Sequence, residues 1–293
     1  MFRGTYTALV TPFQNDRVDE DAFERLIEFQ IENGITGLVP VGTTGESPTL
    51  DHEEHMRVIE LAIKFARGRC QILAGTGSNS TREAIAMTRD AEKLGADGAL
   101  LVAPYYNRPT QEGIFLHYKA IAEATALPLV LYSIPGRCGV EIGVDTTKRL
   151  AETARNIVCI KEAGGSVERV NALRAALPEE FTILSGDDSL TLPFMASGAV
   201  GVISVASNIA PKEVGDLVRL FDNGKITEAR ALHLKLYPLF KDLFIESNPV
   251  PIKAALAWAG RMKPDVRLPL SPITEASATK LRATLQALNL LAS

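Results

Sequence analysis

Residues 157–163 read Ile-Val-Cys-Ile-Lys-Glu-Ala, a short apolar run rich in β-branched side chains and interrupted by one lysine. This length and composition are typical of a strand that is buried on both faces of a parallel sheet. An amphipathic stretch at residues 167–177 follows, so the local pattern is a strand and then a helix. The same alternation of predicted strands and helices continues in both directions along the chain.

Eight strand–helix units follow this pattern. The predicted strands occupy residues 5–12, 37–42, 71–77, 98–104, 128–135, 157–163, 181–186 and 201–207. The predicted helices occupy residues 19–34, 52–68, 81–95, 111–125, 144–153, 167–177, 190–198 and 212–224. Short, right-handed connections leave few topologies, so we predict an α/β protein folded as a (β/α)₈ TIM barrel. A doubly wound open sheet is the alternative, although no Gly-x-Gly-x-x-Gly motif follows the first strand.

The strand pattern stops after residue 224. Residues 226–245, 249–260 and 274–291 have helical periodicity. Asn248 and Pro249 resemble a helix start, with Asn248 as the N-cap and the proline in the first turn. We therefore predict a barrel domain at residues 1–224 and a C-terminal helical appendage at residues 225–293 that packs on it.

Composition narrows the class of protein. The 293 residues carry a net charge of −4 without a basic stripe, which argues against nucleic-acid binding. Charges or prolines interrupt every apolar run before the ~20 residues of a membrane helix, and no secretory signal precedes the first strand. The three cysteines are widely spread and lack the spacing of metal ligands, so we expect reduced packing residues in a cytoplasmic protein.

The active site of this fold lies at the carboxyl ends of the strands. Lys161 falls late in the sixth predicted strand, where burial would lower its pKa below the ordinary value of about 10.4. Because a neutral amine can condense with a carbonyl, Lys161 is a candidate Schiff-base lysine. The alternative is a lysine that reaches solvent from the strand end or pairs with Glu162.

Three motifs lie at the same predicted mouth. Residues 42–46 (Gly-Thr-Thr-Gly-Glu) offer backbone N–H groups and hydroxyls to a carboxylate or phosphate, or form an ordinary turn. In residues 132–137 (Tyr-Ser-Ile-Pro-Gly-Arg), Tyr132 can pass protons and Arg137 can hold a carboxylate. The alternatives are a packing aromatic and a solvated charge. Residues 105–109 (Tyr-Tyr-Asn-Arg-Pro) are more typical of an interface.

Five motifs in order carry a resemblance: GTTGE at 42–46, YYNRP at 105–109, YSIPGR at 132–137, IKEA at 160–163 and GVISVASN at 201–208. Together they resemble the pyruvate-dependent class I aldolases of the dihydrodipicolinate synthase/N-acetylneuraminate lyase family, over essentially the whole chain. The pattern is most similar to members that condense pyruvate with aspartate semialdehyde on the path to diaminopimelate and lysine. Sialic acid lyases, which tend to read GSTGE and lack an arginine matching Arg137, and sugar-acid aldolases, which usually lack YYNRP, are the alternatives. Ser133 stands where asparagine is common.

The resemblance implies a role for each motif. Lys161 would form an imine with the pyruvate ketone, and Tyr132 would shuttle protons through Thr43 and through Tyr106, which reaches into a neighbouring subunit's site. Thr44 and the main chain at Ile203 would hold the carboxylate of pyruvate, and Arg137 would receive the carboxylate of the aldehyde. Gly186 would line the same cavity. No metal or organic cofactor is implied.

The resemblance also implies regulation and assembly. Lysine-inhibited members bind lysine at a tight dimer interface, and their pattern resembles Ser47, Pro48, His52, His55, Asn79, Glu83 and Tyr105 here, with Pro48 where alanine is common. His52 and His55 lie close enough for a metal but lack a third ligand nearby, which favours a capping or effector role. A homotetramer built from two tight dimers is implied. A barrel that acts only as a scaffold or ligand sensor is the non-enzyme alternative, and would form no adduct with pyruvate.

Overall fold

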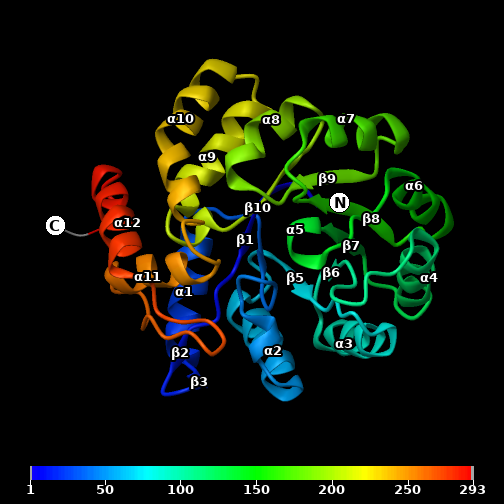
Figure 1. Cartoon of the computed structure of the whole chain (residues 1–293), viewed down its shortest axis with the longest axis horizontal. Helices are drawn as coiled ribbons and strands as arrows, with labels where there is room; N and C mark the ends of the chain where they lie inside the picture. The colour runs from blue at the N-terminus through cyan, green and yellow to red at the C-terminus, as the bar shows by residue number, and fades with distance from the viewer. Residues whose placement is uncertain (1, 292–293) are drawn as a thin grey trace.

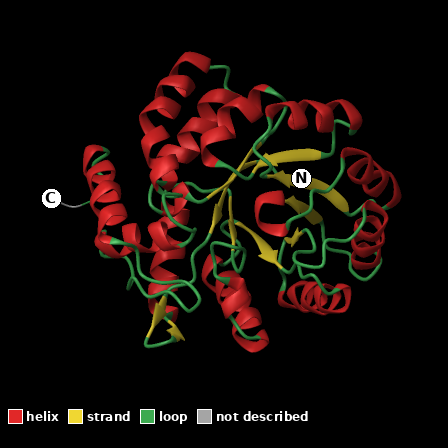
Figure 2. Cartoon of the chain, viewed as in Figure 1, coloured by secondary structure: helices red, strands yellow, loops and turns green. Residues whose placement is uncertain are grey.

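A computed structural model describes residues 2–291 of the chain, and its centre is a closed barrel of eight parallel strands (Figures 1 and 2). In chain order the strands are β1 (Gly4–Ala8), β4 (Gly37–Val39), β5 (Gln71–Gly75), β6 (Gly98–Val102), β7 (Leu129–Ser133), β8 (Ile157–Glu162), β9 (Thr182–Ser185) and β10 (Gly201–Ser204). Strand β1 pairs with both β4 and β10, which closes the ring. The predicted TIM barrel is confirmed.

Helices surround the barrel and join successive strands (Figure 2). They are α1 (Glu20–Glu32), α2 (His52–Ala66), α3 (Thr81–Leu94), α4 (Gln111–Ala122), α6 (Val144–Thr153), α7 (Val167–Ala176), α8 (Thr191–Ala196) and α9 (Pro211–Asp222). Five of them begin at a side chain that accepts a hydrogen bond from the first turn, namely Asp19, Asp51, Ser80, Thr110 and Ser166. These caps explain why the predicted helix starts agree with the structure.

The loops at the carboxyl ends of the strands hold short elements that the sequence did not predict. They include the hairpin of β2 (Phe13–Gln14) and β3 (Arg17–Val18), the one-turn helix α5 (Pro135–Cys138), and the 3₁₀ turns η1 (Ser47–Thr49), η2 (Asp188–Leu190) and η3 (Ala206–Asn208). Several strands also end earlier than predicted. Apolar residues such as Leu9 and Val41 lie beyond the last strand residue but are still buried, so the apolar pattern in the sequence runs on past the end of the strand. The mouth of the barrel is therefore built from packed loops.

Three helices form the C-terminal region: α10 (Ile226–Asp242), α11 (Val250–Trp258) and α12 (Glu275–Ala287). Helix α10 packs along α9, and α12 packs on α10 and α11, so the three lie together on one side of the barrel (Figure 1). The division into domains at residues 224 and 225 stays a prediction.

The predicted N-cap of α11 is wrong. The helix starts at Val250, its cap position is Pro249, and no side chain caps it. The side chain of Asn248 turns instead toward the barrel, where Nδ2 donates to Thr44 Oγ1 over 3.0 Å. Among the residues that the structure describes, no helix is long and apolar enough to span a membrane.

Candidate active site

Lys161 and Tyr132 lie side by side at the carboxyl ends of β8 and β7. The parallel register pairs the two residues directly, and Lys161 Nζ lies 4.0 Å from the centroid of the Tyr132 ring. Both are only 5% exposed. The structure therefore brings together the amine and the phenol that the sequence singled out.

The amine of Lys161 has no carboxylate within ion-pairing distance among residues 2–291. Glu162, the alternative partner, points to the other face of the strand, as consecutive strand residues do. There its Oε2 accepts a hydrogen bond of 2.8 Å from Arg169 Nε. Burial lowers the pKa of Lys161 to about 7, against an opposing effect of the Asp188 carboxylate. The neutral, nucleophilic amine is therefore far more populated at neutral pH than it is in a free lysine, whose pKa is about 10.4.

Gly186, just after β9, makes room for the stem of Lys161. A Cβ at this position would lie 3.0 Å from Lys161 Cε and 2.7 Å from Ala163 Cβ. Ile203 is buried on β10, the second strand beyond β8. The predicted wall of the substrate site thus runs over three neighbouring strands.

Tyr132 also meets Thr43, which follows β4, three strands away from β7 in the barrel. The two residues line a small cavity of about 30 Å³. Burial raises the pKa of Tyr132 to about 12, and Arg137 and a hydrogen bond with Thr43 partly offset that rise. The phenol is therefore protonated at neutral pH and can donate a proton.

Thr44 and Arg137 are linked through one residue of the C-terminal region. The hydroxyl of Thr44, which is buried, accepts the hydrogen bond from Asn248 Nδ2. The exposed Arg137, on α5, donates from Nη2 to the main-chain oxygen of Asn248 over 3.2 Å. The sequence analysis gave Asn248 only a capping role, because its contacts with Thr44 and Arg137 join positions far apart in the chain.

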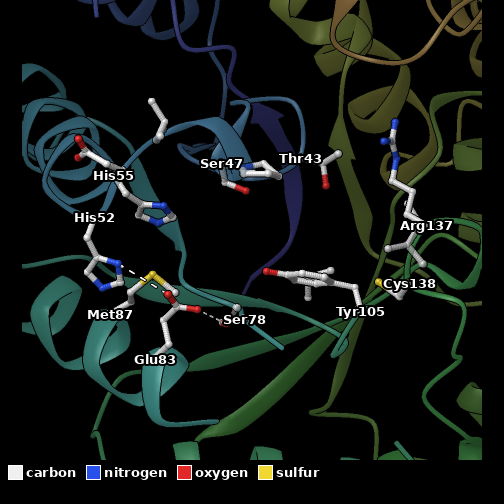
Figure 3. Close-up of a pocket in the computed structure, with 16 residues that line it drawn as sticks. Thr43, Ser47, His52, His55, Ser78, Glu83, Met87, Tyr105, Arg137 and Cys138 are labelled. Atoms are coloured by element: carbon white, nitrogen blue, oxygen red, sulfur yellow. Dashed lines mark hydrogen bonds and ion pairs between the residues drawn. The ribbon is translucent and has the colours of Figure 1, made fainter. Parts of the chain in front are cut away.

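A larger cavity of about 400 Å³ joins the barrel mouth to the predicted effector residues (Figure 3). Its lining includes Thr43 and Arg137 together with Ser47, Pro48, His52, His55, Glu83 and Tyr105. Figure 3 shows Tyr105 and Arg137 on one side of this cavity and the two histidines with Glu83 on the other. Within the described residues, Lys161 and Thr44 do not line it.

The polar groups of this cavity are held by their neighbours. His55 Nε2 lies 2.8 Å from the Gly75 carbonyl oxygen, and His52 Nδ1 lies 3.8 Å from Glu83 Oε1. Glu83 also accepts a hydrogen bond from Ser78. Within residues 2–291, no group of three or more His, Cys, Asp or Glu side chains is arranged to hold a metal ion.

Six predicted residues line neither cavity, namely Lys161, Thr44, Gly186 and Ile203, which are described above, and Asn79 and Tyr106. Asn79 does not line them, but its Nδ2 donates to the main-chain oxygen of Tyr105 over 3.2 Å and so supports that loop. Tyr106 is 89% exposed. Its role in a neighbouring subunit's site stays a prediction.

Buried polar residues near the mouth were also missed. Asp188, within η2, accepts hydrogen bonds of 3.0 Å from the N–H groups of Val205 and Ala206, and burial raises its pKa to about 6. Glu46, part of the GTTGE motif, forms an ion pair with Lys253 on α11. A lysine inside the apolar run of residues 250–258 is the signal that could have identified the Glu46–Lys253 ion pair.

Comparison with known proteins identifies the family of the chain. The sequence model of the dihydrodipicolinate synthetase family matches residues 1–288. The 4-hydroxy-tetrahydrodipicolinate synthase of Geotalea uraniireducens is 55% identical over 99% of this chain and 100% of its own length. The solved synthase of Methylacidiphilum fumariolicum SolV superposes with a TM-score of 0.97 at 58% identity and full coverage of both chains. A synthase from Cyanidioschyzon merolae, solved with lysine bound, has a TM-score of 0.96 at 43% identity, with 99% of each chain covered. The chain belongs to the dihydrodipicolinate synthetase family.

Proposed function

We propose that this chain is a lyase that condenses pyruvate with L-aspartate 4-semialdehyde to form 4-hydroxy-tetrahydrodipicolinate, in the biosynthesis of diaminopimelate and lysine. The observation that carries the proposal is the buried Lys161 amine, which lacks an ion-pair partner among the described residues and lies beside the Tyr132 phenol. The relatives at 55% and 58% identity are 4-hydroxy-tetrahydrodipicolinate synthases, which supports this choice of second substrate over a sugar acid or N-acetylmannosamine.

Lys161 acts as the nucleophile. Its Nζ adds to the pyruvate ketone, water leaves, and the imine then loses a proton from the methyl carbon to give an enamine. The enamine carbon attacks the aldehyde carbon, which regenerates the imine, and the resulting alkoxide takes up a proton. The amino group of the aldehyde substrate then adds to the imine carbon and displaces the Lys161 amine, which closes the ring and releases 4-hydroxy-tetrahydrodipicolinate. Tyr132 moves these protons with Thr43 and with Tyr106 of a neighbouring subunit. No organic cofactor enters the sequence of steps.

Thr44 and the main chain at Ile203 hold the carboxylate of pyruvate, while Arg137 receives the carboxylate of the aldehyde. A guanidinium is suited to this task because its planar donors match the two carboxylate oxygens. Gly186 leaves space beside the Lys161 stem for the reacting carbons.

Trapping with borohydride and pyruvate tests the proposal. Reduction of the imine should add the mass of pyruvate, less one water and plus two hydrogens, to the peptide that bears Lys161. Lys161→Met should abolish the adduct, whereas Lys93→Met, which replaces an exposed lysine on α3, should keep it. An adduct on the Lys253 peptide, or none at all, would overturn the assignment. Assays with aspartate semialdehyde, glyceraldehyde and N-acetylmannosamine then identify the second substrate.

Lysine is the proposed feedback effector of the larger cavity. Carboxylate, imidazole and phenol groups there suit the charged ends of an amino acid, and the lysine-bound relative from C. merolae supports the choice. Because Thr43 and Arg137 line the same cavity, a ligand bound there can reach the catalytic groups. Millimolar lysine should lower the rate of condensation, and Glu83→Gln should weaken that inhibition. An unchanged rate would remove the effector role alone.

We further propose a cytoplasmic homotetramer built as a dimer of tight dimers. The exposed Tyr106 supports a subunit contact at the loop after β6. Cys70, Cys138 and Cys159 are all free thiols, as expected in a reducing compartment. Analytical ultracentrifugation tests the assembly.

A further inference from the structure

Asn248 connects the two proposed carboxylate-binding groups although it belongs to neither. It is 95% buried, just before α11, and its contacts point toward the barrel mouth. Its Nδ2 donates to Thr44 Oγ1 over 3.0 Å, and its main-chain oxygen accepts from Arg137 Nη2 over 3.2 Å. One residue of the C-terminal region thus touches both sides of the substrate site.

The hydrogen bond from Asn248 Nδ2 to Thr44 Oγ1 restricts where the hydroxyl proton of Thr44 can point. A hydroxyl has a single proton, and it can accept one bond while it donates another. Since the amide of Asn248 donates to Thr44 Oγ1, the Thr44 proton is free to point away from Asn248. A hydroxyl held in this way presents a donor to an incoming carboxylate, and no proton has to be reoriented when pyruvate binds.

The other end of the Asn248 amide is unsatisfied. Its Oδ1 is buried and has no hydrogen-bond partner within residues 2–291. A buried acceptor without a partner costs free energy, so an asparagine kept only for packing would be expected to pair both ends of its amide. The arrangement favours the bond to Thr44 over full satisfaction of the amide, as expected of a residue that serves the site.

We propose that Asn248 is a positioning residue for pyruvate, which orients the Thr44 hydroxyl as a donor to the pyruvate carboxylate. The main-chain oxygen of the same residue anchors the Arg137 guanidinium, so the C-terminal region fixes both carboxylate sites. This proposal rests on the proposed function, because it assigns the role of Thr44 to pyruvate.

Two variants of Asn248 separate orientation from packing. Asn248→Ala leaves the Thr44 hydroxyl free to rotate, and the KM for pyruvate should rise about tenfold, the loss expected for one hydrogen bond to a charged group. Asn248→Asp introduces an acceptor, so the Thr44 proton turns toward the new carboxylate, and the KM for pyruvate should rise further. Both variants keep the main-chain oxygen that holds Arg137. The KM for the aldehyde should therefore stay within about twofold of the unsubstituted value.

A double-variant cycle with Thr44→Val tests whether Asn248 acts through Thr44. Without the hydroxyl, Asn248→Ala should change the KM for pyruvate by less than about twofold. Effects that multiply instead, or equal losses for both substrates, would overturn the proposal. Circular dichroism checks folding. If Asn248→Ala does not fold, the nearly isosteric Asn248→Asp variant carries the test.

Pyruvate trapping by borohydride, without the aldehyde, distinguishes this proposal from the proposed function. If the unsubstituted chain traps pyruvate and Asn248→Asp shows the same half-saturating pyruvate concentration, only the role of Asn248 is overturned. If the unsubstituted chain traps no pyruvate, the proposed function and the role of Asn248 are both overturned.

Discussion

Two lysines, Lys161 and Lys253, have buried side chains among the described residues. Lys253 is fully buried, and its Nζ lies 2.5 Å from Glu46 Oε1, so its charge is neutralised by a partner. Lys161 has no such partner, and its pKa falls to about 7 through burial. The presence of a lysine in an apolar run predicts burial in both cases. Only the tertiary partner decides which amine is free to react.

The pKa of Lys161 predicts how adduct formation depends on pH. A lowered pKa means that the ammonium loses its proton as the pH rises through about 7, and only the neutral amine attacks pyruvate. The initial rate of trapping by pyruvate and cyanoborohydride should therefore rise through this range and then level off. Mass spectrometry of timed samples measures the rate. A midpoint near the ordinary lysine value of about 10.4 would contradict the prediction.

A substitution of Asp188 should shift the midpoint of this titration. Its carboxylate stabilises the protonated amine, so Asp188→Asn should lower the pKa of Lys161 and move the midpoint below about 7. An amide oxygen can still accept from the N–H groups of Val205 and Ala206, which preserves the local fold. A midpoint that moves upward would show that Asp188 does not act on the amine in this way.

Tyr132→Phe should separate proton transfer from packing. The ring beside Lys161 remains, but the hydroxyl is lost, and kcat for condensation should fall about 10²- to 10⁴-fold, as for the loss of a general acid–base. Tyr118→Phe is the matched control, because this fully buried phenol donates to the Leu101 carbonyl oxygen away from the mouth. It should reduce stability by about 1 kcal/mol and leave kcat nearly unchanged. Equal losses of kcat in both variants would contradict the role of Tyr132.

At the scale of elements, periodicity explains what the sequence could predict. The barrel strands are short, nearly continuous apolar runs, and the helices between them carry a period of 3.6 residues that persists over several turns. The hairpin of β2 and β3 and helix α5 span too few residues to show a period. The bond between Asn248 and Thr44 joins residues 204 positions apart, and no local pattern records such a contact. Motif residues were therefore predictable, but the groups that hold them were not.

The Glu46–Lys253 pair joins the turn after β4 to α11. Both side chains are 0% exposed, and Glu46 Oε2 also accepts from the backbone N–H of Arg267 over 3.0 Å. Lys253→Met would leave the Glu46 charge buried without its partner, and the free energy of unfolding should fall by about 3–5 kcal/mol. Glu46→Gln combined with Lys253→Met removes both charges and should recover much of that loss.

Urea unfolding monitored by circular dichroism measures these differences. Lys93→Met is the control, because it breaks an exposed pair with Asp90 and should leave the unfolding midpoint unchanged. If the double variant is as unstable as Lys253→Met, then the pair matters through its shape and not through its charges.

At the scale of the whole molecule, several large apolar side chains remain exposed. Leu234 and Tyr237 are exposed on α10, and Tyr105 and Tyr106 are exposed on the loop after β6. Exposed apolar groups of this size are typical of contacts between subunits. In the proposed dimer of dimers, we expect these two separate regions to make the two kinds of subunit contact. The loop after β6 is the one next to the large cavity, because Tyr105 lines it.

Subunit complementation tests whether Tyr106 acts in a neighbouring site. Lys161→Met chains lack the nucleophile, and Tyr106→Phe chains lack the donated hydroxyl, so each homo-oligomer should have little activity. In a mixed dimer, the intact Lys161 of one chain receives the intact Tyr106 of the other, and one of its two sites is complete. Random mixing at equal concentrations should restore about a quarter of the unsubstituted activity, since half of the dimers are mixed and each has one complete site.

The two variants must exchange subunits, so they are unfolded together and refolded before the assay. Lys161→Met mixed with Tyr132→Phe is the control, because both residues belong to one barrel and face one site. That mixture should regain no activity, because every barrel in it lacks either Lys161 or the Tyr132 hydroxyl, whichever chains pair. A single chain carrying both Lys161→Met and Tyr106→Phe, mixed with the unsubstituted chain, should instead leave every mixed dimer with an incomplete site on each side. Activity that follows only the count of unsubstituted chains would show that Tyr106 serves its own barrel, since an exposed tyrosine acting in cis gains nothing from a partner.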